Sequence, residues 1–369
     1  NIIKGLTAKT ELSLNRNWNQ EKTWDAGQTE KDNSSAKLKK SDGYGVRWAT
    51  TLNYEVQGLG DDHNLSFLVG NEVLASKSDY TEIYGVGYPE GFTMDDAFGM
   101  INMTTPSLGQ DYFKGEIGTP NHTLSWFGRA NYSYKGKYLL TATFRADGSS
   151  KFGTNNKWGT FPSVSVGWNI TQESFMEKVN WLNDLKLSVG YGITGNQTGL
   201  DPYKTLELYG TDGVYYDTGS WLPSYKISQN ANPDLKWEQT AMLNIGLDFS
   251  VLDSRLGGRI EWYNKKTSDM LYTYPVPTPP YLYSEIMANV GDMRNTGIEL
   301  SLNADAIRTK DFDWNISLNL AHNENEVTRL SNDVFTMDKI LLGDVFIRGG
   351  SSSGTHVLEE GRPIGQFYG

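Results

Sequence analysis

Residues 232–270 read NPDLKWEQTAMLNIGLDFSVLDSRLGGRIEWYNKKTSDM, a stretch with two alternating halves around a very short turn. In the first half every second residue is apolar, namely Leu243, Ile245, Leu247, Phe249 and Val251. After Asp253 and Ser254 the alternation resumes, with one face made of Leu256, Gly258, Ile260 and Trp262. The opposite face of this half is polar and carries Arg255, Arg259, Glu261 and Lys265. Period-two alternation is typical of a strand with one apolar and one polar face, so the stretch predicts an antiparallel β-hairpin.

The length of these two strands indicates which solvent meets the apolar face. Alternation alone does not decide, because sheets of soluble sandwiches alternate too. The two strands run for roughly ten to fifteen residues, whereas strands of globular proteins usually have about five or six. A strand of an outer-membrane barrel needs about nine to eleven tilted residues, apolar toward lipid and polar toward a wet interior. We therefore expect the hairpin to cross a membrane twice.

The composition of the 369-residue chain excludes several classes of protein. The mean hydropathy is −0.51 and no run of about eighteen apolar residues occurs, which excludes a helical membrane protein. The formal charge of −11 disfavours a nucleic-acid partner. The chain has no cysteine, so disulfide scaffolds, thiolate metal sites and cysteine nucleophiles are excluded. A membrane barrel remains compatible with the hydropathy, because only alternate residues of each strand touch lipid.

Connections between the expected strands alternate between short and long. Short ones are Gly58–His63 and Lys135–Lys137, and long ones are the polar run Arg16–Asp42, Asp79–Pro120 and the aromatic stretch Gly195–Pro233. Short periplasmic turns and long extracellular loops are typical of membrane barrels, whereas sandwiches and propellers have more even spacing. The whole pattern predicts about eleven long strands in an all-β chain.

Five segments resemble the barrel of SusC/RagA-type TonB-dependent transporters, and they occur in the order of that family. They are Arg145–Gly153, Tyr191–Gln197, Asn232–Glu238, Asn289–Leu300 and Pro363–Gly369. The resemblance covers the chain from about Arg145 to its end, whereas the first part fits only by its strand-and-loop style. It implies part of a large antiparallel transmembrane β-barrel of about 22 strands around a plugged interior, with about half of them here.

The resemblance also implies a place and a task for the protein. It implies a transporter in the outer membrane of Bacteroidetes-type bacteria, in contact with outer-membrane lipid. Such proteins import a large nutrient, commonly a glycan or an oligopeptide, with a SusD-like surface lipoprotein as a lid. TonB supplies the energy through a plug domain. No cofactor is implied.

Parts of that family architecture are not found in residues 1–369. We find no plug domain, no TonB-contacting segment and no closing strand at the C-terminus. Half a barrel leaves two bare sheet edges in lipid, which is not tolerated. We therefore expect residues 1–369 to be an internal barrel segment of a longer protein, in which plug and TonB contacts belong to other residues.

No catalytic or metal-binding constellation is predicted. The four histidines lie in unrelated segments without the spacing of zinc ligands, and they are His63, His122, His322 and His356. We interpret them as exposed or interior wall residues and expect no enzyme activity.

Aromatic residues in one long loop are the candidate nutrient-binding residues. They are Tyr209, Tyr215, Tyr216, Trp221 and Tyr225. Aromatic faces stack on sugar rings and on peptide side chains, and a loop above a barrel interior is a suitable place for both. The alternative is that they pack the loop against itself or against a partner. A weaker candidate set in the earlier loop is Tyr80, Tyr84, Tyr88 and Phe92.

Two other function classes remain open from the residues alone. One is a passive porin or structural outer-membrane barrel, which an encoded plug domain would exclude. The other is a soluble, secreted carbohydrate-binding β-protein or glycosidase, which requires that the apolar face pack in a core rather than meet lipid.

A pair of substitutions tests the assignment of the two faces. Leu247→Arg, near the middle of a crossing, is expected to cost about 2–4 kcal/mol in a membrane barrel, whereas Asp248→Arg on the polar face is expected to cost little. Unfolding of both variants in lipid vesicles measures the difference, and equal tolerance would contradict the assignment. Because a soluble core also rejects Leu247→Arg, the solvent is tested separately, by gel mobility of the outer-membrane fraction with and without boiling.

Overall fold

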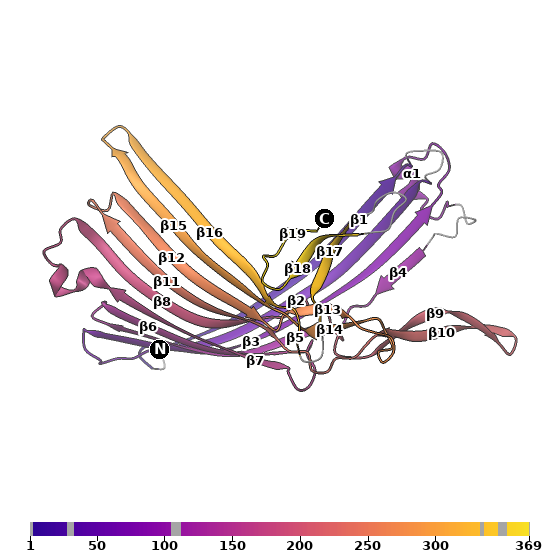
Figure 1. Cartoon of the computed structure of the whole chain (residues 1–369), viewed down its shortest axis with the longest axis horizontal. Coiled ribbons are helices and arrows are strands. Elements are labelled where there is room, and N and C mark those ends of the chain that lie inside the picture. The colour runs from indigo at the N-terminus through magenta and orange to yellow at the C-terminus, as the bar shows by residue number, and fades with distance from the viewer. Residues whose placement is uncertain (1–2, 28–32, 105–111, 333–335, 346–352, 369) are drawn as a thin grey trace. The chain divides into compact units, whose positions relative to one another are not determined.

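The computed structural model describes residues 3–27, 33–104, 112–332, 336–345 and 353–368, and long antiparallel strands make up most of them (Figure 1). The largest sheet has the order β1-β2-β3-β5-β6-β7-β8-β11-β12-β15-β16. Its first strands are β1 (Leu6–Asp25), β2 (Ser35–Glu55), β3 (His63–Val86), β5 (Asn121–Tyr134), β6 (Tyr138–Ser149) and β7 (Trp158–Asn169). The others are β8 (Leu182–Asn196), β11 (Glu238–Val251), β12 (Leu256–Ser268), β15 (Asp292–Arg308) and β16 (Asp313–Arg329). The prediction of about eleven long strands is confirmed.

Smaller elements form in the long connections. β4 (Tyr112–Glu116) pairs with β3, β9 (Leu208–Asp217) with β10 (Ser220–Gln229), and β13 (Leu271–Pro275) with β14 (Glu285–Asn289). β17 (Lys339–Val345), β18 (Ser353–Glu359) and β19 (Gln366–Phe367) form a third small sheet. The helical elements are α1 (Met94–Gly99) and the 3-10 turns η2 (Ile170–Gln172) and η3 (Ser174–Met176). Among the described residues, no helix has the length and apolar character needed to span a membrane.

Strand register joins the apolar residues of neighbouring strands into rows. One row crosses five strands through the directly paired residues Leu187, Leu247, Ile260, Leu300 and Leu320. Several residues of this face are strongly exposed, including Leu320 at 56% and Ile298 at 48%. Exposed leucine and isoleucine in a continuous band is the pattern expected of a surface covered by lipid.

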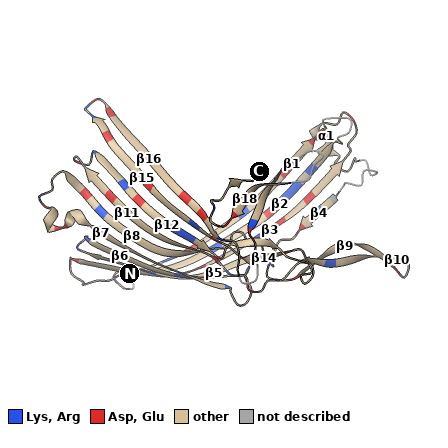
Figure 2. Cartoon of the chain, in the orientation of Figure 1, with Lys and Arg blue, Asp and Glu red and all other residues tan. Residues whose placement is uncertain are grey.

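The adjacent row on the other face is polar. It runs through the paired residues Lys186, Asp248, Arg259, Ser301 and Asn319. Charged residues recur along these strands in Figure 2. A single sheet with one apolar and one hydrated face is the wall of a membrane barrel, as the hairpin at 232–270 predicts.

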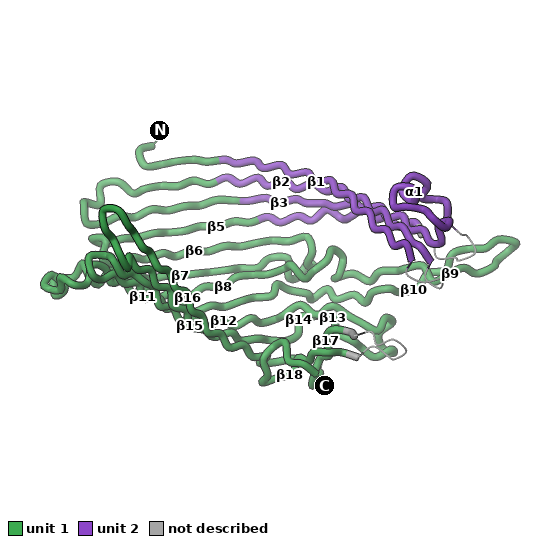
Figure 3. Tube along the Cα trace, turned by 90° about the horizontal axis from the view of Figure 1, so that it is seen from above, with its two compact units in different colours: residues 1–9, 51–71, 125–369 green, residues 10–50, 72–124 purple. Residues whose placement is uncertain are grey.

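The buried apolar clusters are built from the connections between strands and from the strand ends next to them. Two clusters belong to the larger unit in Figure 3, which holds residues 1–9, 51–71 and 125–369. One of them packs β13 and β14 with the end of β16 and with β17, and includes Tyr274, Ile286, Val290, Val327 and Ile340. The other includes Phe152, Phe161, Leu200, Leu235 and Trp237.

The second unit holds residues 10–50 and 72–124 and corrects one expectation. The polar run Arg16–Asp42 is not a long loop, because β1 continues to Asp25 and β2 begins at Ser35. Residues 28–32 lie outside the described part. An ion pair joins the two strands, with the Nη2 of Arg16 2.8 Å from the Oδ2 of Asp42. The prediction was wrong because these strand segments carry polar residues on both faces, so the period-two signal is lost.

The second unit also shows that two weaker candidate aromatics pack inside the loop. Tyr88 is buried with Ala36 and Ala97, and Phe92 packs against this cluster. The hydroxyl of Tyr88 donates to the carbonyl oxygen of Ile101 at 2.8 Å. These side chains stabilise the loop that contains α1.

The pairing of Asp248 changes the substitution test of the two faces. The Nη1 of Arg259 lies 2.9 and 2.8 Å from the two carboxylate oxygens of Asp248. Asp248→Arg would therefore place two guanidinium groups together and would not be well tolerated. Ser250 is on the same polar face and pairs in register with Asp184, which can accept a new cation.

We expect Ser250→Arg to change the free energy of unfolding by less than about 1 kcal/mol and Leu247→Arg to cost about 2–4 kcal/mol, because only the second charge enters lipid. Urea unfolding of the full-length protein in vesicles measures both values. Equal destabilisation by the two substitutions would contradict the assignment of Leu247 to the lipid face and Ser250 to the polar face.

Candidate functional site

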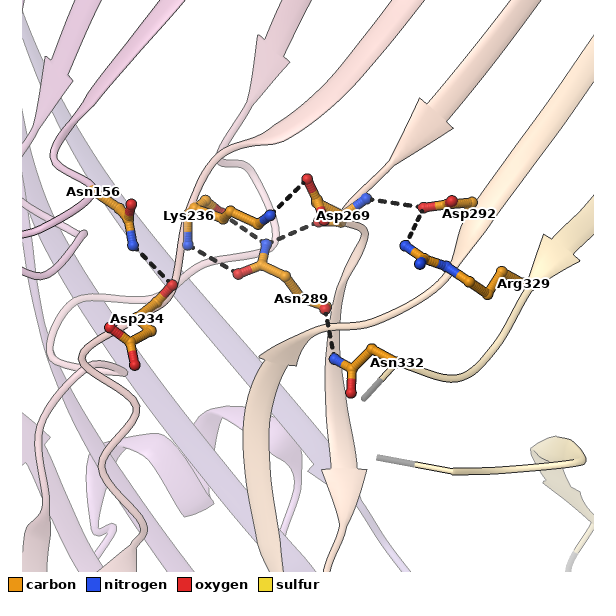
Figure 4. A network of polar contacts seen from close by, with 8 residues as sticks. All are labelled: Asn156, Asp234, Lys236, Asp269, Asn289, Asp292, Arg329 and Asn332. Carbon is orange, nitrogen blue, oxygen red and sulfur yellow. Dashed lines mark hydrogen bonds and ion pairs between the residues drawn. The ribbon is translucent and has the colours of Figure 1, made fainter. Parts of the chain in front are cut away.

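The segments at 232–238 and 289–300, which carry the family resemblance, meet at the base of the long loops (Figure 4). The side-chain amide of Asn289 donates to the carbonyl oxygens of Lys236 and Asp269, both at 2.8 Å. Its Oδ1 accepts from the backbone N–H of Lys236 at 2.9 Å. One asparagine thus satisfies backbone groups of two other segments, in the way a neighbouring strand would.

Charged residues extend this contact to the next strand. The ammonium of Lys236 lies 3.0 Å from the carboxylate of Asp269. The Oδ1 of Asp292 accepts from the backbone N–H of Asp269 at 3.3 Å and from the Nη2 of Arg329 at 3.2 Å. Asp292 is buried, so these charge-assisted bonds replace the water that its carboxylate loses. Arg329 ends β16, and the network therefore joins the loop ends of β11, β12, β15 and β16.

The segment 145–153 joins the same layer through close packing. The indole N–H of Trp237 donates to the carbonyl oxygen of Lys157 at 3.2 Å, and the ring of Phe152 lies 4.9 Å from the ring of Trp237. Gly153 approaches the carbonyl oxygen of Pro233 so closely that an added Cβ would lie only 2.3 Å from it. The glycine is therefore required by the contact between two loops and not by a turn.

The remaining two segments, 191–197 and 363–369, form similar hydrogen bonds to their neighbours. The amide of Asn196 donates to Glu238 at 3.1 Å, and the backbone N–H of Ile364 donates to the Oδ1 of Asn325 at 2.6 Å. Gly369, the last residue of the closing segment, lies outside the described residues. The described parts of all five segments hold loops or strand ends to their neighbours. Their role in the structure is the construction of the loop bases.

The candidate aromatic residues lie on the hairpin β9–β10, which forms a sheet of its own. Trp221 pairs with Tyr216, and their rings are 5.3 Å apart at 64°. On β10 Tyr225 lies four residues from Trp221 and therefore on the same face. The register shift in β9 between 211 and 214 brings Thr211, which pairs with Tyr225, and then Tyr209 onto that face too, whereas Tyr215 is on the opposite one. All five side chains are 51–68% exposed. The structure therefore brings them onto one hairpin but divides them between two faces.

Charged neighbours set the protonation of two groups on this hairpin. The carboxylate of Asp212, 2.6 Å from the ammonium of Lys226, raises the pKa of that lysine. The hydroxyl of Tyr209 donates to Glu207, and this bond raises the pKa of the tyrosine. Both groups keep their protons at neutral pH.

The stem of the hairpin is fixed by residues that sequence reasoning missed. Gln229 donates to the carbonyl oxygens of Tyr203 and Leu206, both at 2.8 Å. The buried amide of Asn230 donates to the carbonyl oxygens of Tyr283 and Glu285 at 2.6 and 2.8 Å. Asn230 directly follows β10 and Asn289 ends β14, and their bonding partners lie twenty to fifty-five residues away, so no local signal identifies them.

Groupings of three or more acidic, histidine or cysteine side chains suited to a metal ion do not occur in the part of the chain that the structure describes. The arrangement offers a polar barrel wall, a cross-linked loop layer and an exposed aromatic hairpin.

Comparison with known proteins identifies the family. Residues 4–344 match the family model described as TonB dependent receptor-like, beta-barrel. The chain belongs to this family. The TonB-dependent receptor SusC of Bacteroides thetaiotaomicron is 42% identical over 68% of the chain. The TonB-dependent receptor P39 of Formosa agariphila is 31% identical over the whole chain. The chain spans 25% of the length of the first relative and 33% of the second.

A solved structure of the RagAB peptide transporter shares the fold. Its TM-score is 0.80 with 25% identity, over 98% of this chain and 38% of the other. The resemblance to SusC/RagA-type transporters, the barrel fold and the outer-membrane location are thereby confirmed. These relatives are receptors and transporters by description, not enzymes.

Removal of the side chain of Asn289 tests the loop network. Asn289→Ala is expected to lower the free energy of unfolding by about 1–3 kcal/mol, because it leaves backbone groups of Lys236 and Asp269 without partners. Limited proteolysis of the full-length protein should then cut the loops between 197 and 290 faster. Asn319→Ala, on the polar wall, is the control. An unchanged digestion rate for Asn289→Ala would show that the network does not stabilise the loops.

The close loop contact predicts a second effect. Gly153→Ala is expected to cost about 1–3 kcal/mol, since the new Cβ overlaps the carbonyl of Pro233. Gly199 has open space around it and tolerates alanine. Thermal unfolding of both variants gives the comparison, and similar melting temperatures would refute the packing argument.

Proposed function

We propose that this chain is a segment of the barrel wall of a TonB-dependent importer, which takes up a large nutrient across the outer membrane. The observation that carries the proposal is the pair of rows through Leu247 and Asp248, one apolar and one polar, in a chain of the TonB-dependent receptor family. A hydrated wall offers hydrogen bonds to a passing polar solute, while the apolar face holds the wall in lipid. Binding and translocation, without covalent chemistry, are the expected activity.

The rest of the machinery belongs to parts of the protein beyond this segment. We expect a plug domain to fill the barrel interior and to receive energy from TonB. A SusD-like surface lipoprotein is the expected lid over the loops, because the relatives include SusC and RagAB. The solved RagAB structure is described as a peptide transporter, so an oligopeptide and a glycan are the two substrate classes to test.

The hairpin β9–β10 is the proposed nutrient contact of this segment. Tyr216 and Trp221 share one face with edge-to-face rings and leave most of their surface exposed. Such a pair is a suitable platform for a sugar ring or an apolar peptide side chain. Tyr225 and Tyr209 extend this platform along the same face, and Tyr215 is exposed on the reverse face, so one hairpin can contact two parts of a large ligand.

A passive porin is the alternative, and energy dependence separates it from the importer. Uptake of the nutrient by cells that carry the full-length protein should stop when TonB is deleted. Uptake that continues at the same rate without TonB would support the porin. A soluble secreted protein is excluded by membership in an outer-membrane family.

Substitutions on the hairpin test the nutrient contact. Trp221→Ala in the full-length protein is expected to weaken nutrient binding about 3- to 10-fold, the effect of losing one aromatic contact. Phe175→Ala is the control, because Phe175 is similarly exposed but lies on η3 in a short turn. Calorimetric titration with glycan and oligopeptide mixtures measures both variants. Equal affinity of Trp221→Ala and wild type would remove this face from the binding site.

A further inference from the structure

The outward face of β1 and β2 changes from apolar to charged at one level. Leu12, Leu14 and Trp18 alternate along β1 and are 64–71% exposed. The indole N–H of Trp48 on β2 donates to the hydroxyl of Thr10 at 3.1 Å, which places Trp48 on this same face. Arg16 follows Leu14 on this face, before Trp18, and forms an ion pair with Asp42 of β2.

The opposite face of the same strands has a different character. Arg47 there contacts Glu72 at 2.5 Å and Glu11 at 3.4 Å. Polar interior and apolar exterior are therefore clearly divided in this unit, as in the larger one. The level of Arg16 and Asp42 marks the upper border of the apolar band, where acyl chains meet headgroups.

A hollow of about 390 Å³ lies on the outward face at this border. It is lined by residues of β1, β2 and β3, including Trp18, Gln20, Lys40, Asp42, Asp79 and Thr81. All of them belong to the unit of residues 10–50 and 72–124. The hollow therefore lies within one compact part of the structure.

The charges around the hollow do not cancel. Arg16 is paired with Asp42, and Lys77 lies 3.0 Å from Asp79. Lys40 makes no ion pair or ring contact with any residue that the structure describes, and its side chain is exposed. The two carboxylates of the lining, Asp42 and Asp79, are thus each matched by a neighbouring cation, and the positive charge of Lys40 remains. The guanidinium of Arg16 also lies 5.0 Å from the ring centre of Trp18, which holds both side chains at the rim.

We propose that this hollow binds the phosphate-bearing headgroup of an outer-membrane lipid. The ammonium of Lys40 contacts the phosphate as a flexible point charge. The ring of Trp18, one step beyond Arg16 on the same face, lies at the level of the headgroups, which is the preferred position of tryptophan in membrane proteins. Leu12 and Leu14 continue the surface downward along β1, so the acyl chains of the same molecule have an apolar track beside the headgroup site.

The apolar track distinguishes a lipid from a free anion. Inorganic phosphate would use Lys40 alone, whereas a lipid gains apolar contact along β1 as well. The inference does not depend on which nutrient is imported. It requires only that the barrel stand in the outer membrane.

The experiment measures lipid binding to the full-length protein in detergent by native mass spectrometry. The probes are phosphatidic acid, the diacylglycerol with the same chains, and inorganic phosphate. We expect phosphatidic acid to bind best and to be retained about fivefold less by Lys40→Gln, the effect of one basic residue at a lipid surface. Trp18→Ala should reduce retention of both lipids, because it removes the apolar contact.

Lys186→Gln is the matched control, since it removes the same charge from the polar wall. Retention of phosphatidic acid should be unchanged in that variant. Equal retention of phosphatidic acid and diacylglycerol would overturn the proposal. So would equal losses in Lys40→Gln and Lys186→Gln. Displacement of phosphatidic acid by inorganic phosphate at the same concentration would show an anion site without lipid specificity, and would also overturn it.

Discussion

Each long strand of this protein needs one apolar face and one polar face, because the sheet is a single layer with lipid on one side and water on the other. Backbone hydrogen bonds between neighbouring strands are the interaction on which this depends, since no water is available in the hydrocarbon to replace them. These hydrogen bonds fix the register of neighbouring strands, and the register determines which side chains lie side by side in one row. Leu187, Leu247 and Ile260 fall together on one face, and Lys186, Asp248 and Arg259 fall together on the other. A shift of one strand by a single residue would exchange the two faces.

A wall of this kind has no hydrophobic core of its own, which explains where the packing is found. The buried clusters around Tyr274 and Trp237 lie in the connections and at the strand ends next to them. Polar side chains supplement them, and Asn289 and Asp292 join segments that are far apart in sequence. The segments that resemble the transporter family are therefore the ones that close the loop layer. Asn289 and Asp292 each have several partners there, whereas a wall residue only needs the correct polarity.

Periodicity was enough to predict the wall from the sequence, but it could not predict the loops. Residues Leu243 to Val251 alternate so regularly that they predict the strand, the side of the sheet to which each side chain points, and the hairpin. Arg16 to Asp42 were interpreted as a loop because a strand above the lipid border has water on both sides and needs no apolar residue. The partners of Asn230 and Asn289 depend on tertiary structure, with twenty to fifty-five residues between donor and acceptor. The five aromatics of β9 and β10 were correctly placed in one segment, yet their division between two faces depends on the hairpin register.

The hairpin β9–β10 is attached to its surroundings at its stem, through Gln229 and Asn230, while its ten-residue strands pair only with each other. With such an attachment, the residues near the turn of the hairpin do not affect the strand register of the large sheet. Exchange of the residues between the stem and the turn alters what the loop presents to the outside, and the barrel register is not disturbed. A barrel built in this way can change the surface that one loop presents through replacement of a short segment, and the wall can then remain constant.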